Sequence, residues 1–80
     1  MMEHPDAGEQ AAIDGAQRLR KVQVALSEMG YGPLPTDGTM DRATSDALRG
    51  FQLDNGLAVT GENGDDVIKR LVAIGAMQAN

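Results

Sequence analysis

Apolar residues recur at intervals of three and four in the first half of the chain, which is the spacing of one face of an α-helix. The residues concerned are Leu19, Val22, Leu26 and Met29. Asp14 is suited to cap the start of this helix, and Gln17 three residues later fits a capping box. Gly30 offers the left-handed conformation that ends many helices. The pattern therefore predicts a first helix from Asp14 to Met29.

The next stretch, residues 30–41 (GYGPLPTDGTMD), holds three Gly and two Pro, a density that excludes regular structure. We expect an ordered loop that Tyr31 and Leu34 pin to the core, with a turn at Asp37-Gly38. A second apolar face follows in Thr44, Ala47, Leu48 and Phe51. With Asp41 as N-cap and Asn55-Gly56 as a stop signal, this face predicts a second helix.

A third helix is expected after a short extended connector at residues 57–60, which Gly61 breaks. Asn63 is the candidate N-cap, and Asp65 and Asp66 lie in the first turn, where carboxylates favour the positive end of the helix dipole. The broad apolar face of this helix consists of Val67, Ile68, Leu71, Val72 and Ile74. The helix should close near Gly75.

Two of these segments resemble each other at an offset of 23 residues. Gly38, Asp41, Thr44 and Leu48 correspond to Gly61, Gly64, Val67 and Leu71, so a loop-plus-helix unit occurs twice. Each unit buries only one face and must pack on the other and on the first helix. The expected fold class is all-α, a compact three-helix bundle, with a flexible acidic leader at residues 1–12, the domain at 13–76 and a tail at 77–80.

Charge and composition narrow the class of function. The net charge is −5, and residues 10–80 hold 7 basic and 9 acidic residues, a net charge of −2. A chain without a basic stripe has no means of holding phosphate backbones, so we expect no nucleic-acid binding. There is no Cys, no apolar run that could span a bilayer, and no signal peptide in MMEHPDAGEQ. We expect no membrane insertion and a monomer.

The order of short motifs resembles the peptidoglycan-binding-domain family of small three-helix modules. It is carried by Leu19, Val22-Gln23, Leu26, Met29-Gly30-Tyr31, Asp37-Gly38, Thr44, Ala47-Leu48, Phe51-Gln52, Gly56-Leu57 and Thr60-Gly61, within residues 17–72. The resemblance implies a non-catalytic module that holds a hydrolase or envelope protein near the bacterial cell wall. It also implies a location in the periplasm or cell wall, although the chain shows no export signal, so it would be an excised domain.

The sequence departs from the family pattern in four places, of which one is a pair of adjacent residues. Met40-Asp41 stands where Phe-Gly is usual, Val22 replaces Leu, and Asn63 and Val67 replace an apolar residue and a Thr in the second unit. The change at Met40 weakens an aromatic wedge, and the changes at Asn63 and Val67 affect any ligand contact by the second unit. We expect the fold to survive all four.

The candidate binding site is a groove between the loop at residues 30–41 and the second helix. Its polar edge would consist of Tyr31, Asp37, Arg42, Gln52 and Asn55. Arg42 lies beside the free N–H groups of a helix start and is suited to hold a stem-peptide carboxylate. Gln23 and Gln52 each follow a core position, where an amide can brace the loop backbone or contact a ligand, and the backbone's need for partners favours bracing.

Candidates for catalysis or metal binding lack partners in the sequence. His4 is the single histidine, Ser27 and Ser45 lie in helices with no adjacent base, and Asp65-Asp66 suits a helix dipole. Asp37, Thr39 and Asp41 alternate as in a calcium loop, but Arg42 and Leu48 stand where that loop needs Gly and an acid. We therefore expect no enzyme, no metal and no cofactor. Arg18, Arg20 and Lys21 are interpreted as a solvated face.

The primary hypothesis is a wall-binding module whose partner is peptidoglycan, as a muropeptide or a glycan strand, with a fused or associated hydrolase or envelope protein. One alternative is an interaction adaptor that kept the bundle and docks a protein through the face at Leu34 and Met40. An acyl-carrier-like protein is a second alternative, disfavoured because Ser45 follows Thr44 inside a helix. A wall-lytic enzyme is disfavoured by the lack of catalytic residues.

Overall fold

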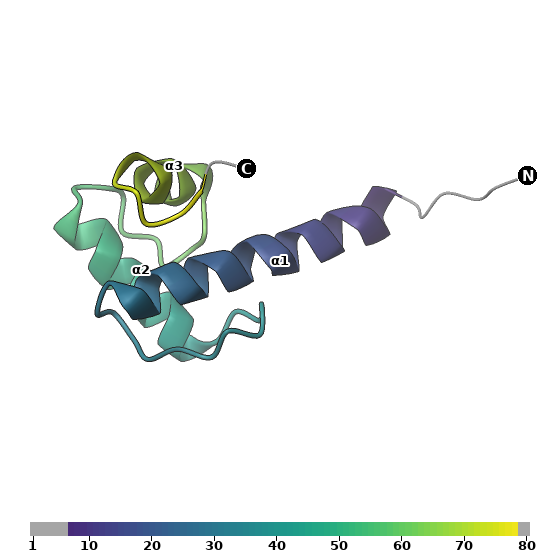
Figure 1. Cartoon of the computed structure of the whole chain (residues 1–80), viewed down its shortest axis with the longest axis horizontal. Coiled ribbons are helices and arrows are strands. Elements are labelled where there is room, and N and C mark those ends of the chain that lie inside the picture. Colours follow the sequence, from purple (N-terminus) through teal and green to yellow (C-terminus); the bar gives the residue numbers. More distant parts are fainter. Residues whose placement is uncertain (1–6, 79–80) are drawn as a thin grey trace, which may run out of the picture.

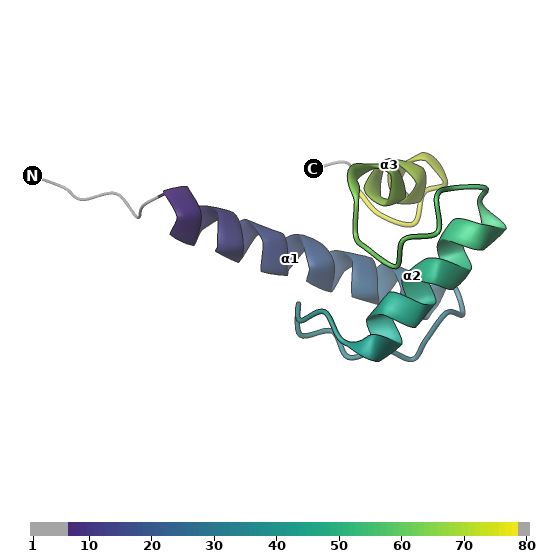
Figure 2. The ribbon, with the colours of Figure 1, turned by 180° about the vertical axis from the view of Figure 1, so that it is seen from behind.

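The chain folds as three helices joined by irregular loops. The computed structural model describes the backbone of residues 7–78 and the side chains of residues 15–78. The helices are α1 (Ala7–Glu28), α2 (Arg42–Asp54) and α3 (Asp65–Ala73), with no strand among the described residues. Figures 1 and 2 show that the last turns of α1 pack with α2 and α3, while its first turns project beyond them. The all-α three-helix fold is confirmed.

The first helix starts earlier than predicted. α1 begins at Ala7, so Asp14 lies inside the helix, and the prediction that it is the N-cap is wrong. The physical reason is that the run AGEQAA consists mostly of strong helix formers, whose propensity extends the helix past the capping signal. Residues 7–12, assigned above to a flexible leader, therefore belong to α1. Residues 1–6, with His4, lie outside the described residues.

The start and end of the second helix follow the predicted capping signals. The Asp41 carboxylate accepts a hydrogen bond of 2.8 Å from the backbone N–H of Thr44, one of the donors that a helix start leaves free. The Thr44 side chain, followed by this backbone contact, lowers the pKa of Asp41. Asn55 is the C-cap, and Gly56 follows with φ of 69°. Local sequence therefore sets both ends of α2.

The start of α3 differs from the prediction. Its N-cap is Gly64, which has no side chain to cap with, so the prediction of Asn63 as the cap is wrong. Within the first turn the Asp66 carboxylate accepts a 2.8 Å hydrogen bond from the N–H of Val67. This acid acts one residue inside the helix, so a cap at Asn63 is not needed to satisfy that donor.

The core lies where the three helices meet. Its buried apolar side chains include Leu19, Val22, Leu26, Leu48, Phe51, Val67 and Leu71. Burying each large apolar side chain contributes about 1.5–3 kcal/mol. Met29 and Ile74, placed on apolar faces by periodicity, are instead partly exposed, because each follows the last residue of its helix. Met77, assigned to the tail, packs against the core.

The loops approach the helices through glycines that leave no room for a side chain. Gly38 and Gly61, the equivalent residues of the two units, have φ of 76° and 73°. A Cβ on Gly38 would lie 2.5 Å from the carbonyl oxygen of Ala16 in α1. Gly56 shares the positive φ, at 69°, but faces open space. Close contact with a neighbouring helix therefore distinguishes Gly38 from an ordinary helix-ending glycine.

This difference predicts unequal effects of two equivalent substitutions. Gly56→Ala should cost about 1 kcal/mol of unfolding free energy, because an L-residue at positive φ is strained. Gly38→Ala should cost about 1–3 kcal/mol more, because the added Cβ meets fixed backbone. Urea denaturation followed by circular dichroism measures both. Equal losses for the two variants would contradict the close packing of Gly38 on α1.

Candidate functional site

Tyr31 joins the first loop to the C-terminal half of α2. Its ring meets Phe51 edge to face, with centroids 5.9 Å apart and planes at 82°. The ring lies beside Gly50, where a Cβ would be in ordinary contact with Tyr31 Cδ1 at 3.5 Å. The Tyr31 hydroxyl donates a 2.6 Å hydrogen bond to Asp54. This bond, followed by burial and by the negative charge of Asp54, raises the pKa of Tyr31.

Asp37 and Arg42 lie at the opposite end of α2. Asp37 accepts a 3.0 Å hydrogen bond from the N–H of Thr39, the turn that the sequence predicts. The side chain of Arg42 is 94% exposed, and its Nε lies 3.9 Å from Asp46. Arg42 and Asn55 are separated by about 20 Å along the helix at the usual 1.5 Å rise per residue. The five predicted residues therefore do not converge on one point, and a ligand touching both ends must be extended.

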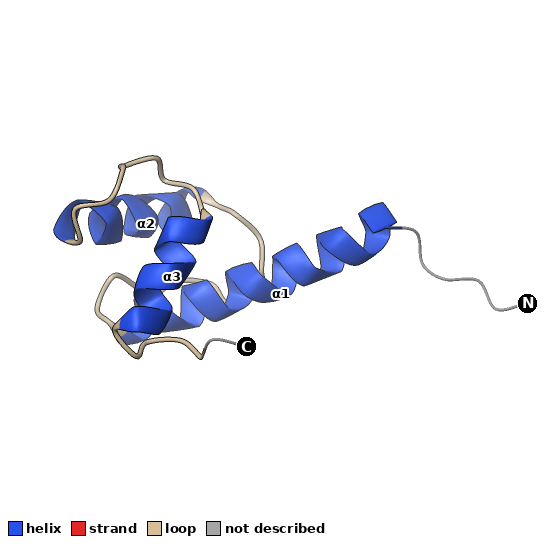
Figure 3. Cartoon of the chain, turned by 90° about the horizontal axis from the view of Figure 1, so that it is seen from above, coloured by secondary structure: helices blue, strands red, loops and turns tan. Residues whose placement is uncertain are grey.

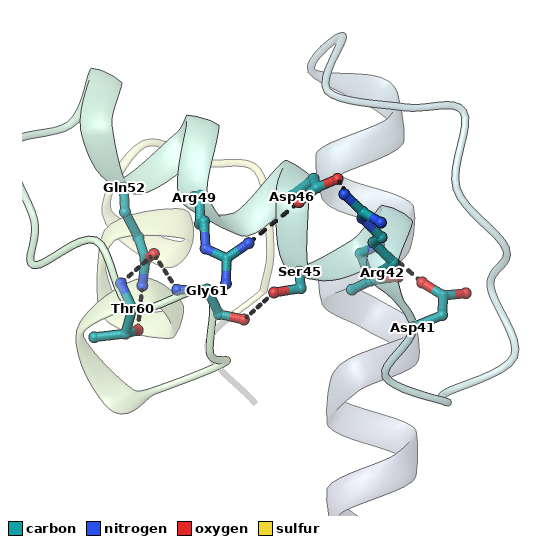
Figure 4. Close-up of polar contacts among 9 residues, drawn as sticks. Asp41, Arg42, Ser45, Asp46, Arg49, Gln52, Thr60 and Gly61 are labelled. Atoms are coloured by element: carbon teal, nitrogen blue, oxygen red, sulfur yellow. Dashed lines mark hydrogen bonds and ion pairs between the residues drawn. The ribbon is translucent and has the colours of Figure 1, made fainter.

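Gln52, predicted at the groove edge, lies inside the molecule. It is 1% exposed, and its amide oxygen accepts hydrogen bonds from the N–H groups of Thr60 (3.0 Å) and Gly61 (2.9 Å). Its amide nitrogen donates to the Thr60 hydroxyl (3.0 Å) and the Glu62 carbonyl (3.3 Å). Figure 4 shows Gln52 pointing from α2 to the connector that leads to α3, with its contacts to Thr60 and Gly61. Gln52 therefore braces the loop and has no free polar group for a ligand.

Gln23 braces the loop before α2, as Gln52 braces the connector before α3. The Gln23 side chain is fully buried, and its oxygen accepts a 2.9 Å hydrogen bond from the N–H of Gly38. Its nitrogen donates to the Thr39 carbonyl and the Thr44 hydroxyl, both at 3.0 Å. Each glutamine projects from one helix and holds the turn that leads into the next.

Asn55 is also committed to internal contacts. Its side-chain nitrogen donates a 2.9 Å hydrogen bond to the carbonyl of Phe51. Arg70 of α3 donates to the Asn55 backbone carbonyl at 3.1 Å and reaches its side-chain oxygen at 3.4 Å. These bonds satisfy carbonyls at the end of α2 and tie it to α3. Of the predicted site residues, Arg42, Asp37 and Tyr31 keep polar groups accessible to a ligand.

A row of polar side chains on the exposed side of α2 was missed as a unit. Asp46 lies between Arg42 and Arg49, whose Nη1 donates to it at 3.2 Å. The Ser45 hydroxyl donates a 3.2 Å hydrogen bond to the carbonyl of Gly61, and a Cβ on Gly61 would lie 2.9 Å from Arg49 Nε. The spacing of three and four residues between these charges could have indicated the row.

Ser27 and Ser45, the two helical serines without an adjacent base, each bond a loop. The Ser27 hydroxyl accepts a 3.1 Å hydrogen bond from the N–H of Leu34, and the Ser45 hydroxyl donates to the carbonyl of Gly61.

Among the residues that the structure describes, no three His, Asp or Glu side chains gather as a metal site needs. None of the described helices is long and apolar enough to span a bilayer. The exposed face of α2 offers hydrogen-bond donors and acceptors in Arg42, Asp46 and Arg49.

Comparison with known protein families places the chain in one of them. Residues 15–71 match the model of a family described as a peptidoglycan binding domain. This match covers more than half of the chain and confirms the resemblance found in the sequence motifs. Neither the curated proteins nor the solved structures gave a match.

The contact between Tyr31 and Asp54 predicts an altered tyrosine titration. Tyr31 is the single tyrosine, so absorbance near 295 nm reports it alone. Its pKa should lie above the ordinary value, and Asp54→Asn should lower it, whereas Asp46→Asn should not. The stability that this bond contributes is present below the ordinary tyrosine pKa and is lost as pH rises through the folded one. Identical titration curves for Asp54→Asn and the wild type would refute the contact.

Proposed function

Because the chain belongs to the peptidoglycan binding domain family, we propose that it is a non-catalytic module that anchors an envelope protein or hydrolase to the bacterial cell wall. The ligand class follows from the family, and the anchoring role is our inference. On this proposal the module works in the periplasm or cell wall as a monomer, and any lytic chemistry resides in its partner.

The observation that carries the proposal is the exposed polar row on α2, held between two braced loops. Arg42 and Arg49 offer guanidinium donors and Asp46 offers acceptors along one side of the helix. Peptidoglycan presents hydroxyls, amides and carboxylates, which such a row can match by hydrogen bonds.

Arg42 is the residue we assign to a stem-peptide carboxylate. It is the first residue of α2, where the helix dipole and the N–H groups that the Asp41 carboxylate does not take favour an anion. Its pairing with Asp46 is long, at 3.9 Å, and solvent-exposed, so it contributes little and can be exchanged for a ligand. Asp37 and Tyr31 flank the two ends of the same helix and would contact neighbouring groups of an extended strand.

Weak affinity at one such surface suffices for anchoring. The wall is a polymer that presents the same chemical unit many times, so dissociation from one unit is followed by rebinding to the next. A shallow exposed surface without a deep cleft is therefore compatible with stable residence at the wall.

The adaptor alternative depends on a docking face at Leu34 and Met40. Met40 is 43% exposed, but Leu34 packs against the core. One exposed methionine is a normal feature of a protein surface. The polar row on α2 therefore supports wall binding better than the loop supports a protein-docking face.

Sedimentation with purified wall sacculi tests the proposal. The wild-type protein should pellet with sacculi, and Arg42→Ala should reduce the bound fraction about tenfold or more, since a charged hydrogen bond to a carboxylate is lost. Lys69→Ala, an exposed change of equal charge on α3, is the matched control and should bind like the wild type. Circular dichroism should show the same helical signal for all three.

Two results would contradict this account. A wild-type protein that stays in the supernatant would reject wall binding itself. Equal pelleting of the wild type and Arg42→Ala would reject the role of Arg42 on the face of α2.

A further inference from the structure

A hollow of about 370 Å³ lies between α1 and the segment that follows α3, away from the polar row on α2. Its lining residues are Arg20, Lys21, Val24, Ala25, Ala76, Met77 and Gln78. None of the five residues proposed from the sequence as the binding site belongs to it. Residues 76–78 also lie beyond the part of the chain that matches the family, 15–71. The hollow is therefore a separate surface.

One side of the hollow is formed by the turn that follows α3. Gly75 adopts φ of 83°, which sends the chain back toward α1. The N–H groups of Ala76 and Met77 both donate to the carbonyl of Leu71, at 2.9 and 3.2 Å, and both side chains pack against the core. Figure 3 shows this returning segment beside α1. Backbone hydrogen bonds thus fix one side of the hollow.

The opposite side comes from one turn of α1 and is positively charged. Arg20 and Lys21 are exposed, while Val24 and Ala25, one turn later, supply apolar surface below them. Among the described residues that line the hollow there is no acid, and neither cation forms an ion pair with another residue of that part of the chain. The arginines of the α2 row differ, because both contact Asp46.

This combination suits a ligand with small apolar groups next to carboxylates. Ala25 and Ala76 leave space on the floor, and the flexible Met77 can adapt to what fills it. Lys and Arg side chains lay their stems along apolar surface and keep their charged ends at the rim. Two cations at one edge match a ligand that carries more than one carboxylate.

We propose that this hollow binds the stem peptide of peptidoglycan, with alanine methyl groups on its apolar floor and carboxylates at Arg20 and Lys21. The inference rests on the proposed wall-binding function and adds a second contact on another face of the module. The sugar backbone alone fits less well, because it carries one lactyl carboxylate per disaccharide among many hydroxyls, whereas the stem peptide carries several carboxylates beside alanine methyl groups. Two contacts on one polymer would raise the effective affinity above that of either.

An NMR titration of the labelled full chain tests the assignment. The probes are soluble muropeptides with intact stem peptides, glycan strands stripped of peptide, and an acidic peptide of ordinary L-amino acids. Muropeptides should shift the amides of Val24, Ala25, Ala76 and Met77, and the stripped glycan should leave them unchanged. The double variant Arg20→Gln, Lys21→Gln should weaken binding to the hollow about tenfold or more. Arg18→Gln, Lys69→Gln removes the same charge outside the lining and should bind as the wild type.

The outcomes separate this inference from the function on which it rests. If wild-type protein pellets with sacculi but muropeptides leave the hollow's amides unchanged, the stem-peptide site is rejected and wall binding stands. If the acidic L-peptide binds the hollow as tightly as the muropeptides, the site recognises protein segments and the proposal is overturned. If the wild-type protein fails to pellet and no probe shifts any amide, both proposals fail.

Discussion

The structure depends on two buried glutamine amides. Irregular loops in a small domain carry backbone N–H and C=O groups that cannot all reach water, and each unpaired group costs about 1–3 kcal/mol. Gln23 and Gln52 supply both an acceptor and a donor beneath the turns at Gly38 and Gly61. A side chain from one helix thereby sets where the next helix begins, and three short helices become one body.

The bracing by Gln52 divides α2 into a side that faces the core and the loop and a side that faces solvent. Gln52 and Phe51 are consecutive and both buried, one satisfying a loop and the other packing in the apolar core. The exposed side of α2 is thus left to Arg42, Asp46 and Arg49, which contact one another and solvent. Rigid loops at both ends hold this row in place without any of its members contributing to the core.

Much of the fold could be predicted from the sequence, because periodicity and capping are local signals. Asp41 and Gly56 set the ends of α2 as expected. Asp14 failed as a cap because the helix formers before it extend α1 to Ala7. Asn63 failed because α3 is capped by the next residue, Gly64.

The candidate site was harder to predict, because the sequence does not show which side of a helix a loop will cover. The amide of Gln52 could face a ligand or a loop, and only its contacts decide. The hollow beside α1 gave no local signal, since it forms where residues 76–78 return to residues of α1 that stand more than 50 positions earlier in the chain.

Hydrogen exchange of the loop amides, measured by NMR, tests the central claim most directly. If the glutamine amides are the internal partners of the turns, the N–H groups of Gly38 and Gly61 should exchange as slowly as amides in the middle of α2, although both lie in irregular loops. Exchange of these two amides at the rate of an unstructured peptide would show that the turns are open to water, and it would contradict the account.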